Sequence, residues 1–230
     1  MTDKPATPGK TAFANWRDYI IYIGFVAIFL IFAVTLGDRG FLDPNNLLNI
    51  IRQTAIIAVV SVTMTFVLST GEIDLSVGAV AGLASVVTAM AIDQFGIAGG
   101  ILCGLGTGVL VGAVNGWLTT AVGIPSFLTT LAMMGIARGA AMWVSGTAAI
   151  PILSKTYTGI FGAGNLGPVP SLLIWVLVIG IAGHIVLRRT TFGRQVLATG
   201  GNETAARYSG VNPASIKFRV LMLSSIAAAL

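Results

Sequence analysis

Two carboxylates, Glu72 and Asp74, stand between apolar runs in the sequence Gly71-Glu72-Ile73-Asp74-Leu75-Ser76. A carboxylate at the edge of an apolar run is costly to keep there, so a functional role is the default hypothesis. Its oxygens would accept hydrogen bonds from the hydroxyl groups of a polar ligand. A structural role explains the two acids as well: Asp74 would cap a helix that begins near Leu75, and Glu72 would lie at the water interface. The sequence leaves both interpretations open.

Further polar residues lie within or beside the apolar runs. Asn115 either ends a helix or shares a polar path with the two carboxylates. Arg138 lies well inside an apolar run, where its side chain either extends outward to the interface or pairs with a carboxylate inside the protein. The candidate residues for a polar path through the protein are Glu72, Asp74, Ser76, Asn115, Pro125, Ser126 and Arg138.

The patterns that support catalysis or cofactor binding do not occur in the sequence. Cys103 is the single cysteine and His184 the single histidine, and neither has a metal-ligand partner nearby. No Ser, His and acid pattern resembles a catalytic triad, and the Gly-x-x-x-x-Gly-Lys-Ser/Thr sequence of an ATP-binding loop does not occur. We therefore expect no catalytic residue, no metal and no cofactor, and we expect that this chain does not itself bind ATP.

The composition indicates which solvent surrounds these residues. The chain has 230 residues, of which 9% are charged and 55% hydrophobic, and its mean hydropathy is +0.91. A soluble domain carries about 25% charged residues, and a fold of this size could not hide so much apolar surface from water. These values argue against a soluble enzyme, a nucleic-acid-binding protein and a disordered chain, despite the net charge of +5. They predict an all-α bundle of transmembrane helices.

Apolar runs of membrane-spanning length recur along the chain, and they predict six spans plus the start of a seventh. The six runs lie at 20–36, 54–70, 77–92, 97–113, 125–145 and 171–187, and the seventh begins at 220 and stops at 230. Because a run of about 20 residues is needed to cross a bilayer, the sequence looks like a truncated chain. Asp43-Pro44 is expected to start the second helix. Residues 93–96, 115–123 and 146–170 are expected to be connections.

The distribution of charge predicts the orientation. Lys and Arg gather in the N-terminal tail, 1–18, and in the segment 188–219, whereas the loop 146–170 holds one charge, Lys155. Positively charged segments favour the cytoplasmic side of a membrane. This places both the tail and the segment 188–219 in the cytoplasm, which requires an even number of spans between them and agrees with six. The segment 19–230 is then the transmembrane domain.

Within the basic segment, residues 200–210 predict a short helix with a signal at each end. Asn202 is expected to cap it and Glu203 to complement its dipole, while Gly210 provides a left-handed stop. A helix of two turns is too short to be stable unpartnered. We therefore expect a rigid element offered to a partner, with Ala205 and Ala206 leaving room for the partner's cleft; the alternative is a plain solvated loop.

Two motifs resemble one family of membrane proteins. The sequence 194–202, followed by Ala205-Ala206 and 209–211, resembles the coupling loop of the permeases of ribose/xylose/autoinducer-2-type ABC importers. The sequence 71–78 resembles that family's other signature, between its second and third spans. Further matches in the family's order are Asn115-Gly116, 124–127 and 137–139, and the resemblance covers nearly the whole chain from about Phe41 onward.

The resemblance implies an incomplete ABC permease transmembrane domain with a cytoplasmic coupling helix between spans six and seven. It implies import of a small carbohydrate across the cell inner membrane by alternating access. The implied partners are an ABC ATPase subunit, a periplasmic or extracellular sugar-binding protein, a second permease subunit and membrane lipid, and no nucleic acid. The implied ATPase-coupling residues are Arg194, Gly200, Gly201, Asn202, Glu203, Ala205, Ala206, Arg207, Ser209 and Gly210.

Three other functions stay open. The first is a branched-chain amino-acid or nucleoside permease of the same superfamily. The second is an ion-coupled secondary transporter, which needs buried ionisable sites, and only Glu72, Asp74 and Arg138 qualify. The third is an intramembrane enzyme, which the missing nucleophile and base disfavour.

Overall fold

The computed structural model of the chain describes residues 16–162, 164–167 and 169–230, in two compact units that are taken one at a time. The first unit, Met1–Ile50, holds α1 (Trp16–Leu36), the short 3-10 helix η2 (Gly37–Arg39) and the first turns of α2 (Pro44–Ser69). The Asp43 Oδ1 atom accepts a hydrogen bond of 2.8 Å from the backbone N–H of Asn45. This confirms the predicted start of the second helix, whereas the predicted tail lies mostly outside the described residues.

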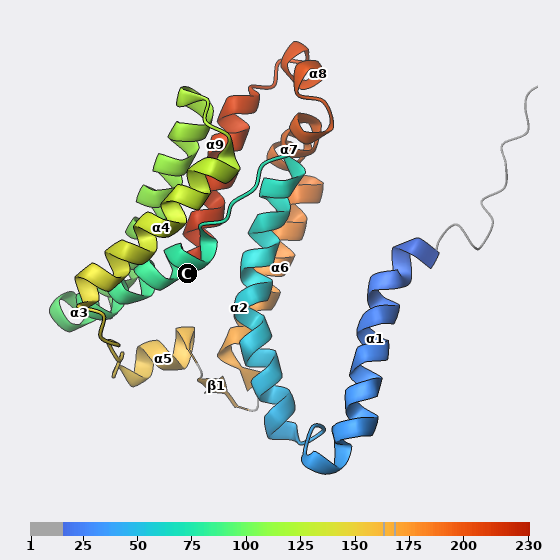
Figure 1. Ribbon diagram of the computed structural model, residues 1–230, viewed down its shortest axis with the longest axis vertical. Coiled ribbons are helices and arrows are strands. Elements are labelled where there is room, and N and C mark those ends of the chain that lie inside the picture. The colour runs from blue at the N-terminus through green and yellow to red at the C-terminus, as the bar shows by residue number, and fades with distance from the viewer. Residues whose placement is uncertain (1–15, 163, 168) are drawn as a thin grey trace, which may run out of the picture. The chain divides into compact units, whose positions relative to one another are not determined.

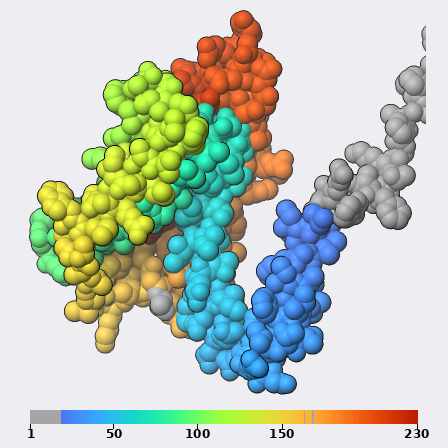
Figure 2. Space-filling view, in the orientation of Figure 1, coloured from blue at the N-terminus to red at the C-terminus, as the bar shows by residue number. Residues whose placement is uncertain are grey.

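The second unit, Ile51–Leu230, holds the rest of α2 and all later elements. They are α3 (Val77–Trp117), the π-helical turn η3 (Leu118–Val122), α4 (Ser126–Ser145), α5 (Lys155–Phe161), β1 (Asn165–Leu166), β2 (Val169–Pro170), α6 (Ser171–Arg189), α7 (Thr191–Gly201), α8 (Glu203–Tyr208) and α9 (Pro213–Ala228). In this unit α7 and α8 lie at one end of the long helices, and α5 and β1 lie at the opposite end (Figure 1). Figure 2 shows the part of the chain that contains α8 projecting beyond the neighbouring helices of this unit.

The described chain contains five helices long and apolar enough to cross a membrane. One of them, α3, contains both of the spans predicted on either side of residues 93–96. Its helical backbone is interrupted at Gly96, where φ is 72° and ψ is −176°. Such a φ is a left-handed conformation that favours glycine. The predicted turn is therefore confirmed at this residue, while the count of six spans stays a prediction.

Several predicted connections contain regular structure, and these predictions were wrong. The connection predicted at 115–123 is helical through Val122, and the loop at 146–170 contains α5 and an antiparallel hairpin of two-residue strands. The hairpin is a small exception to the predicted all-α fold. Ser154 caps α5 through the Tyr157 N–H, and the Phe161 ring stacks on Trp175 of α6 with centroids 5.2 Å apart. These contacts stabilise a helix too short to persist alone.

A row of buried glycines at intervals of four residues lines one face of α3, namely Gly100, Gly104, Gly108, Gly112 and Gly116. The last three let α9 lie directly against α3, whereas Gly100 and Gly104 face Thr88 in the first half of α3. A Cβ atom at Gly112 would lie 2.7 Å from the Met222 Cα atom of α9, and one at Gly108 would lie 2.7 Å from the Ser225 carbonyl oxygen. Small residues at this spacing bring helix backbones together. Glycine is therefore required where α3 and α9 touch.

A second packed cluster joins α7 to α2 and α9. Phe66 and Val67 of α2 pack with Val196 of α7 and with Ile216, Val220 and Leu221 of α9. The Phe192 ring of α7 stacks on Phe66 with centroids 6.3 Å apart. Helix α7 was not predicted, because it lies inside a segment that is basic overall. Its apolar face packs on this cluster and places α8 beyond the ends of α2 and α9.

Candidate functional site

The segment from Gly71 to Ser76 enters the second unit as non-helical chain between α2 and α3. Gly71 ends the turn after α2 with a φ of 81°, and α3 begins only at Val77. Figure 1 follows this segment as a coil from the α7 end of α2 down to the start of α3. Asp74 and Ser76 are 1% and 0% exposed. Non-helical chain in a membrane protein is tolerated where protein surrounds it, and the segment meets that condition on one side only, because Ile73 and Leu75 are 45% and 43% exposed.

Hydroxyl groups of α4 accept hydrogen bonds from two backbone N–H groups of this segment. The Ser126 Oγ atom accepts a hydrogen bond of 3.1 Å from Ile73 N–H, and Thr130 Oγ1 accepts one of 3.0 Å from Leu75 N–H. Ser126 and Thr130 are four residues apart, so they share one face of α4. Ile73 and Leu75 are two residues apart, so their N–H groups point to one side of an extended chain. The spacing of the two hydroxyl groups along α4 matches the spacing of the two N–H groups along the segment. Helix α4 therefore supplies the hydrogen-bond acceptors that a neighbouring strand would supply in a sheet.

Asp74, Ser76 and Asn115 form a buried chain of hydrogen bonds. The Asp74 Oδ1 atom accepts bonds of 2.9 Å from Ser76 N–H and 2.6 Å from the Ser76 hydroxyl, and Asn115 Nδ2 donates to Ser76 Oγ at 3.1 Å. The predicted cap of a helix that begins near Leu75 is not observed: α3 begins at Val77, and its N-cap residue, Ser76, makes no side-chain cap hydrogen bond. Asp74 instead holds the turn before the helix through the Ser76 N–H. Asp74 Oδ2 and Asn115 Oδ1 are buried and have no hydrogen-bond partner among the described residues.

The remaining candidate path residues lie in different surroundings. Pro125 occupies the position before α4, which begins at Ser126. Arg138 lies on an exposed face of α4 and makes no ion pair with any residue that the structure describes. The alternative in which Arg138 pairs with a carboxylate is therefore not observed. The structure brings Asp74, Ser76, Asn115 and Ser126 together and leaves Arg138 apart from them.

Lys217, near the start of α9, joins the segment Gly71–Ser76 to α8. Its Nζ atom lies 2.8 Å from Glu72 Oε1 and 2.8 Å from Glu203 Oε2. The side chains of Lys217 and Glu72 are 20% and 13% exposed, so the ion pair between them is partly shielded from water. Glu203 also pairs with Arg207 on α8, at 3.2 Å and on the surface. Lys217 was not among the candidate residues predicted from the sequence, although it is the only lysine in the basic segment 188–219.

The contacts of Lys217 shift the pKa values of Glu203 and of Lys217 itself. The hydrogen bond from Lys217, with smaller contributions from Arg207, lowers the pKa of Glu203. Burial opposes the charged form of Lys217, but hydrogen bonds to Glu203 and Glu72 outweigh burial and raise the pKa of Lys217. Because the pKa of Glu203 is lower in the folded chain than in the unfolded chain, Glu203 stabilises the fold at a pH above its unfolded-state pKa. This contribution is lost as the pH falls through the folded-state pKa. The pKa of Lys217 is raised in the folded chain, so the stability that Lys217 contributes is lost only as the pH rises through its folded-state pKa.

Helix α8 begins and ends where the sequence predicts. The Asn202 Oδ1 atom accepts a hydrogen bond of 2.9 Å from Ala205 N–H, and Gly210 has a left-handed φ of 82°. Of the two alanines expected to face a partner, Ala205 is exposed but Ala206 is 4% exposed and packs inside its own chain. The expectation for Ala206 was therefore wrong. Tyr208, which sequence reasoning did not select, is 88% exposed.

The other predicted coupling residues surround α8. Arg194 of α7 and Gly201, Arg207 and Ser209 are exposed. A Cβ atom at Gly200 would collide with the Ser69 carbonyl oxygen at the end of α2. Gly200 therefore holds α7 against α2, immediately before the segment Gly71–Ser76.

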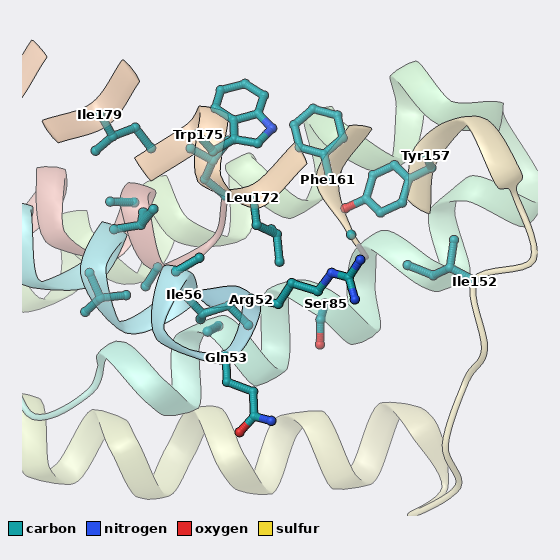
Figure 3. A pocket seen from close by; sticks show the side chains of 18 residues that line it. Arg52, Gln53, Ile56, Ser85, Ile152, Tyr157, Phe161, Leu172, Trp175 and Ile179 are labelled. Atoms are coloured by element: carbon teal, nitrogen blue, oxygen red, sulfur yellow. The ribbon is translucent and has the colours of Figure 1, made fainter. Parts of the chain in front are cut away.

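A cavity of about 550 Å³ lies toward the α5 end of the second unit, between α2, α3, α5, α6 and α9. Its polar and aromatic lining residues include Arg52, Gln53, Ser85, Tyr157, Phe161 and Trp175. Figure 3 shows the Arg52 side chain extending toward Tyr157, and Arg52 Nη2 donates to Asn165 Oδ1 of β1 at 2.9 Å. None of the candidate path residues lines this cavity.

Replacing Asn202 with alanine should loosen α8. The change removes the acceptor of the Ala205 N–H, and loss of such a cap costs about 1 kcal/mol. Hydrogen exchange of the α8 amides, followed by mass spectrometry, should become about fivefold faster, the factor that corresponds to this free energy. Asn212→Ala is the matched control, because it removes the cap of α9. Unchanged exchange in α8 after Asn202→Ala would contradict the capping role.

The five long apolar helices define a polytopic membrane protein of the helical class. Residues 46–230 match the family model described as "Branched-chain amino acid transport system / permease component", and the chain belongs to this family. No solved structure matches the chain.

Several curated relatives carry the names of sugar permeases. The chain is 35% identical to the L-arabinose ABC transporter permease protein AraH of Azospirillum brasilense, over 97% of this chain and 66% of that protein. It is 34% identical to the ribose import permease protein RbsC of Bacillus subtilis, over 90% of this chain and 65% of that protein. It is 30% identical to the xylose transport system permease protein XylH of Escherichia coli, over 94% of this chain and 70% of that protein. The chain thus spans about two thirds of the length of these relatives.

Proposed function

We propose that the chain is a permease subunit of an ATP-driven importer that moves a small carbohydrate across the inner membrane by alternating access. The observation that carries this proposal is the likeness to arabinose, ribose and xylose permeases over at least nine tenths of the chain. The family description names branched-chain amino acids, but the relatives' names favour a sugar. The chain does no chemistry of its own in this proposal.

The partners follow from the same proposal. An ATPase subunit hydrolyses ATP, a binding protein outside the membrane delivers the sugar, and a second permease subunit completes the pathway. The N-terminus and α8 lie in the cytoplasm because Lys and Arg gather in these two parts of the sequence. Helix α8 is the docking element for the ATPase, and the segment 71–78 borders the pathway. The position of α8 at one end of the second unit, with the cavity toward the other, supports this assignment.

Sugar uptake into vesicles tests the proposed function. The chain would be reconstituted with its ATPase and binding protein, and uptake of labelled arabinose, ribose and xylose would be measured with and without ATP. We expect ATP-dependent uptake of one of these sugars. Uptake of leucine or a nucleoside instead, or uptake driven by an ion gradient without ATP, would overturn the proposal.

Ala205→Trp should weaken docking of the ATPase. Ala205 is exposed on α8, so a tryptophan there obstructs a partner without disturbing the fold, whereas Ala206 is buried and unsuitable for this test. We expect about tenfold weaker binding in a pull-down of the ATPase, equivalent to 1.4 kcal/mol. Ala214→Trp, on an exposed position of α9, is the matched control and should leave binding unchanged. Equal binding by both variants would remove α8 from the docking surface.

A further inference from the structure

We propose that Lys217 is the positioning residue that transmits movement of α8 to the non-helical segment Gly71–Ser76. This inference rests on the proposed function, because it takes α8 as the element that the ATPase moves. It adds a specific residue and a specific route. The route runs from Glu203 on α8, through the Lys217 ammonium, to Glu72.

Lys217 has two carboxylate partners, at the same distance, in separate parts of the chain. Its Nζ atom lies 2.8 Å from a carboxylate oxygen on each side. An ammonium group has three N–H donors, so it can donate to both carboxylates at once. When α8 moves, the ammonium must follow Glu203 or lose a charge-assisted hydrogen bond, and it carries Glu72 along.

The segment that receives this movement is held by hydrogen bonds of defined geometry. Two residues beyond Glu72, Asp74 binds Ser76, which in turn binds Asn115 of α3. Ile73 and Leu75 bind the hydroxyls of Ser126 and Thr130 on α4. A displacement of Glu72 therefore acts directly on chain that contacts both α3 and α4.

Two neighbouring contacts, one within α8 and one of α7, do not offer the same route. Arg207 pairs with Glu203 within α8 itself and is on the surface, so this pair links α8 to nothing else. Gly200 packs against Ser69, but it belongs to α7 and has no side chain to pull. Among the ion pairs within the described residues, only those of Lys217 connect different helices or segments.

The charges explain why the cation matters more than either acid. Without Lys217, Glu72 and Glu203 would face one another as two like charges, one of them partly buried. Removing one acid leaves the other paired. Breaking a shielded pair by removing one partner is destabilising because the remaining charge has no compensation. Lys217→Gln should therefore have the largest effect, and Lys217→Arg should preserve the link.

The test measures how many sugars are moved per ATP hydrolysed, in the complete transporter in vesicles. Lys217→Gln should still bind the ATPase and hydrolyse ATP, but the transported sugar per ATP should fall about tenfold, within the range of coupling free energies. Glu72→Gln should also lower this ratio, although Glu72 is not part of α8. Lys217→Arg and the control Arg219→Gln, which removes an exposed positive charge from α9 outside the predicted coupling residues, should stay within about twofold of the unmodified chain.

A second readout separates this inference from the proposed function. Binding of the ATPase to the unmodified chain should change hydrogen exchange at residues 71–76, and in Lys217→Gln that change should be absent while the ATPase remains bound. A normal sugar-to-ATP ratio in Lys217→Gln would overturn the inference, and so would a fall shared equally by Arg219→Gln. If the unmodified chain binds no ATPase and takes up no sugar, the proposed function has failed instead.

Discussion

Gly112→Leu should prevent α9 from packing on α3 and should reduce the amount of folded protein sharply. Even the first atom of the new side chain would lie 2.7 Å from the Met222 Cα atom and 3.0 Å from the Ser225 Cβ atom. The obstacle is backbone, which cannot rotate away as a side chain does. Overpacking of a close contact costs about 3 kcal/mol when the backbone must shift. Thermal unfolding in detergent and the level of protein in the membrane measure the effect.

Gly106→Leu is the matched control for this prediction. Gly106 lies on the same helix, six positions earlier, and a Cβ atom there would meet no atom within 4 Å. Leucine also has a better helix propensity than glycine by about 0.8 kcal/mol. Gly106→Leu should therefore leave the stability unchanged or raise it slightly. If both variants unfolded at the same temperature, the close contact between α3 and α9 would not be the cause.

The helix ends that the sequence predicted correctly depend on local signals. Asn202, Gly210 and Asp43 each act on residues within one turn, so a short stretch of sequence contains the whole cause. Helix α7 was missed because its stability comes from elsewhere. Its Thr190 cap is local, but its apolar residues pack on Phe66 of α2, which no window of sequence around α7 contains.

The candidate site could be predicted only in part, for the same reason. The interruption at Gly71–Ser76 followed from two acids among apolar residues. The partner of Glu72 did not follow, because Lys217 lies far from it along the chain and meets it only in the folded unit. The hydroxyls of Ser126 and Thr130 are four residues apart, a common spacing that gives no indication of a bound extended chain.

Thr130→Val should destabilise the protein and loosen the segment Gly71–Ser76. Valine has nearly the shape of threonine, but it leaves the Leu75 N–H without its acceptor at 3.0 Å. Because this bond is only partly buried, leaving the N–H without a partner should cost about 1 kcal/mol. Hydrogen exchange at residues 71–76 should become faster by the factor that corresponds to this free energy, and the unfolding temperature should fall.

Thr129→Val provides the control, because it makes the same chemical change one residue away. Thr129 is also buried, at 4% exposed, and its hydroxyl has no hydrogen-bond partner among the described residues. Removing a buried hydroxyl without partners costs little and relieves the cost of burying it. We therefore expect Thr129→Val to be neutral or slightly stabilising. If only Thr130→Val lowers the stability, the effect belongs to the hydrogen bond between Thr130 and the extended segment. If both variants lower the stability equally, valine itself is poorly tolerated in this part of α4, and the hydroxyl of Thr130 does not hold the segment.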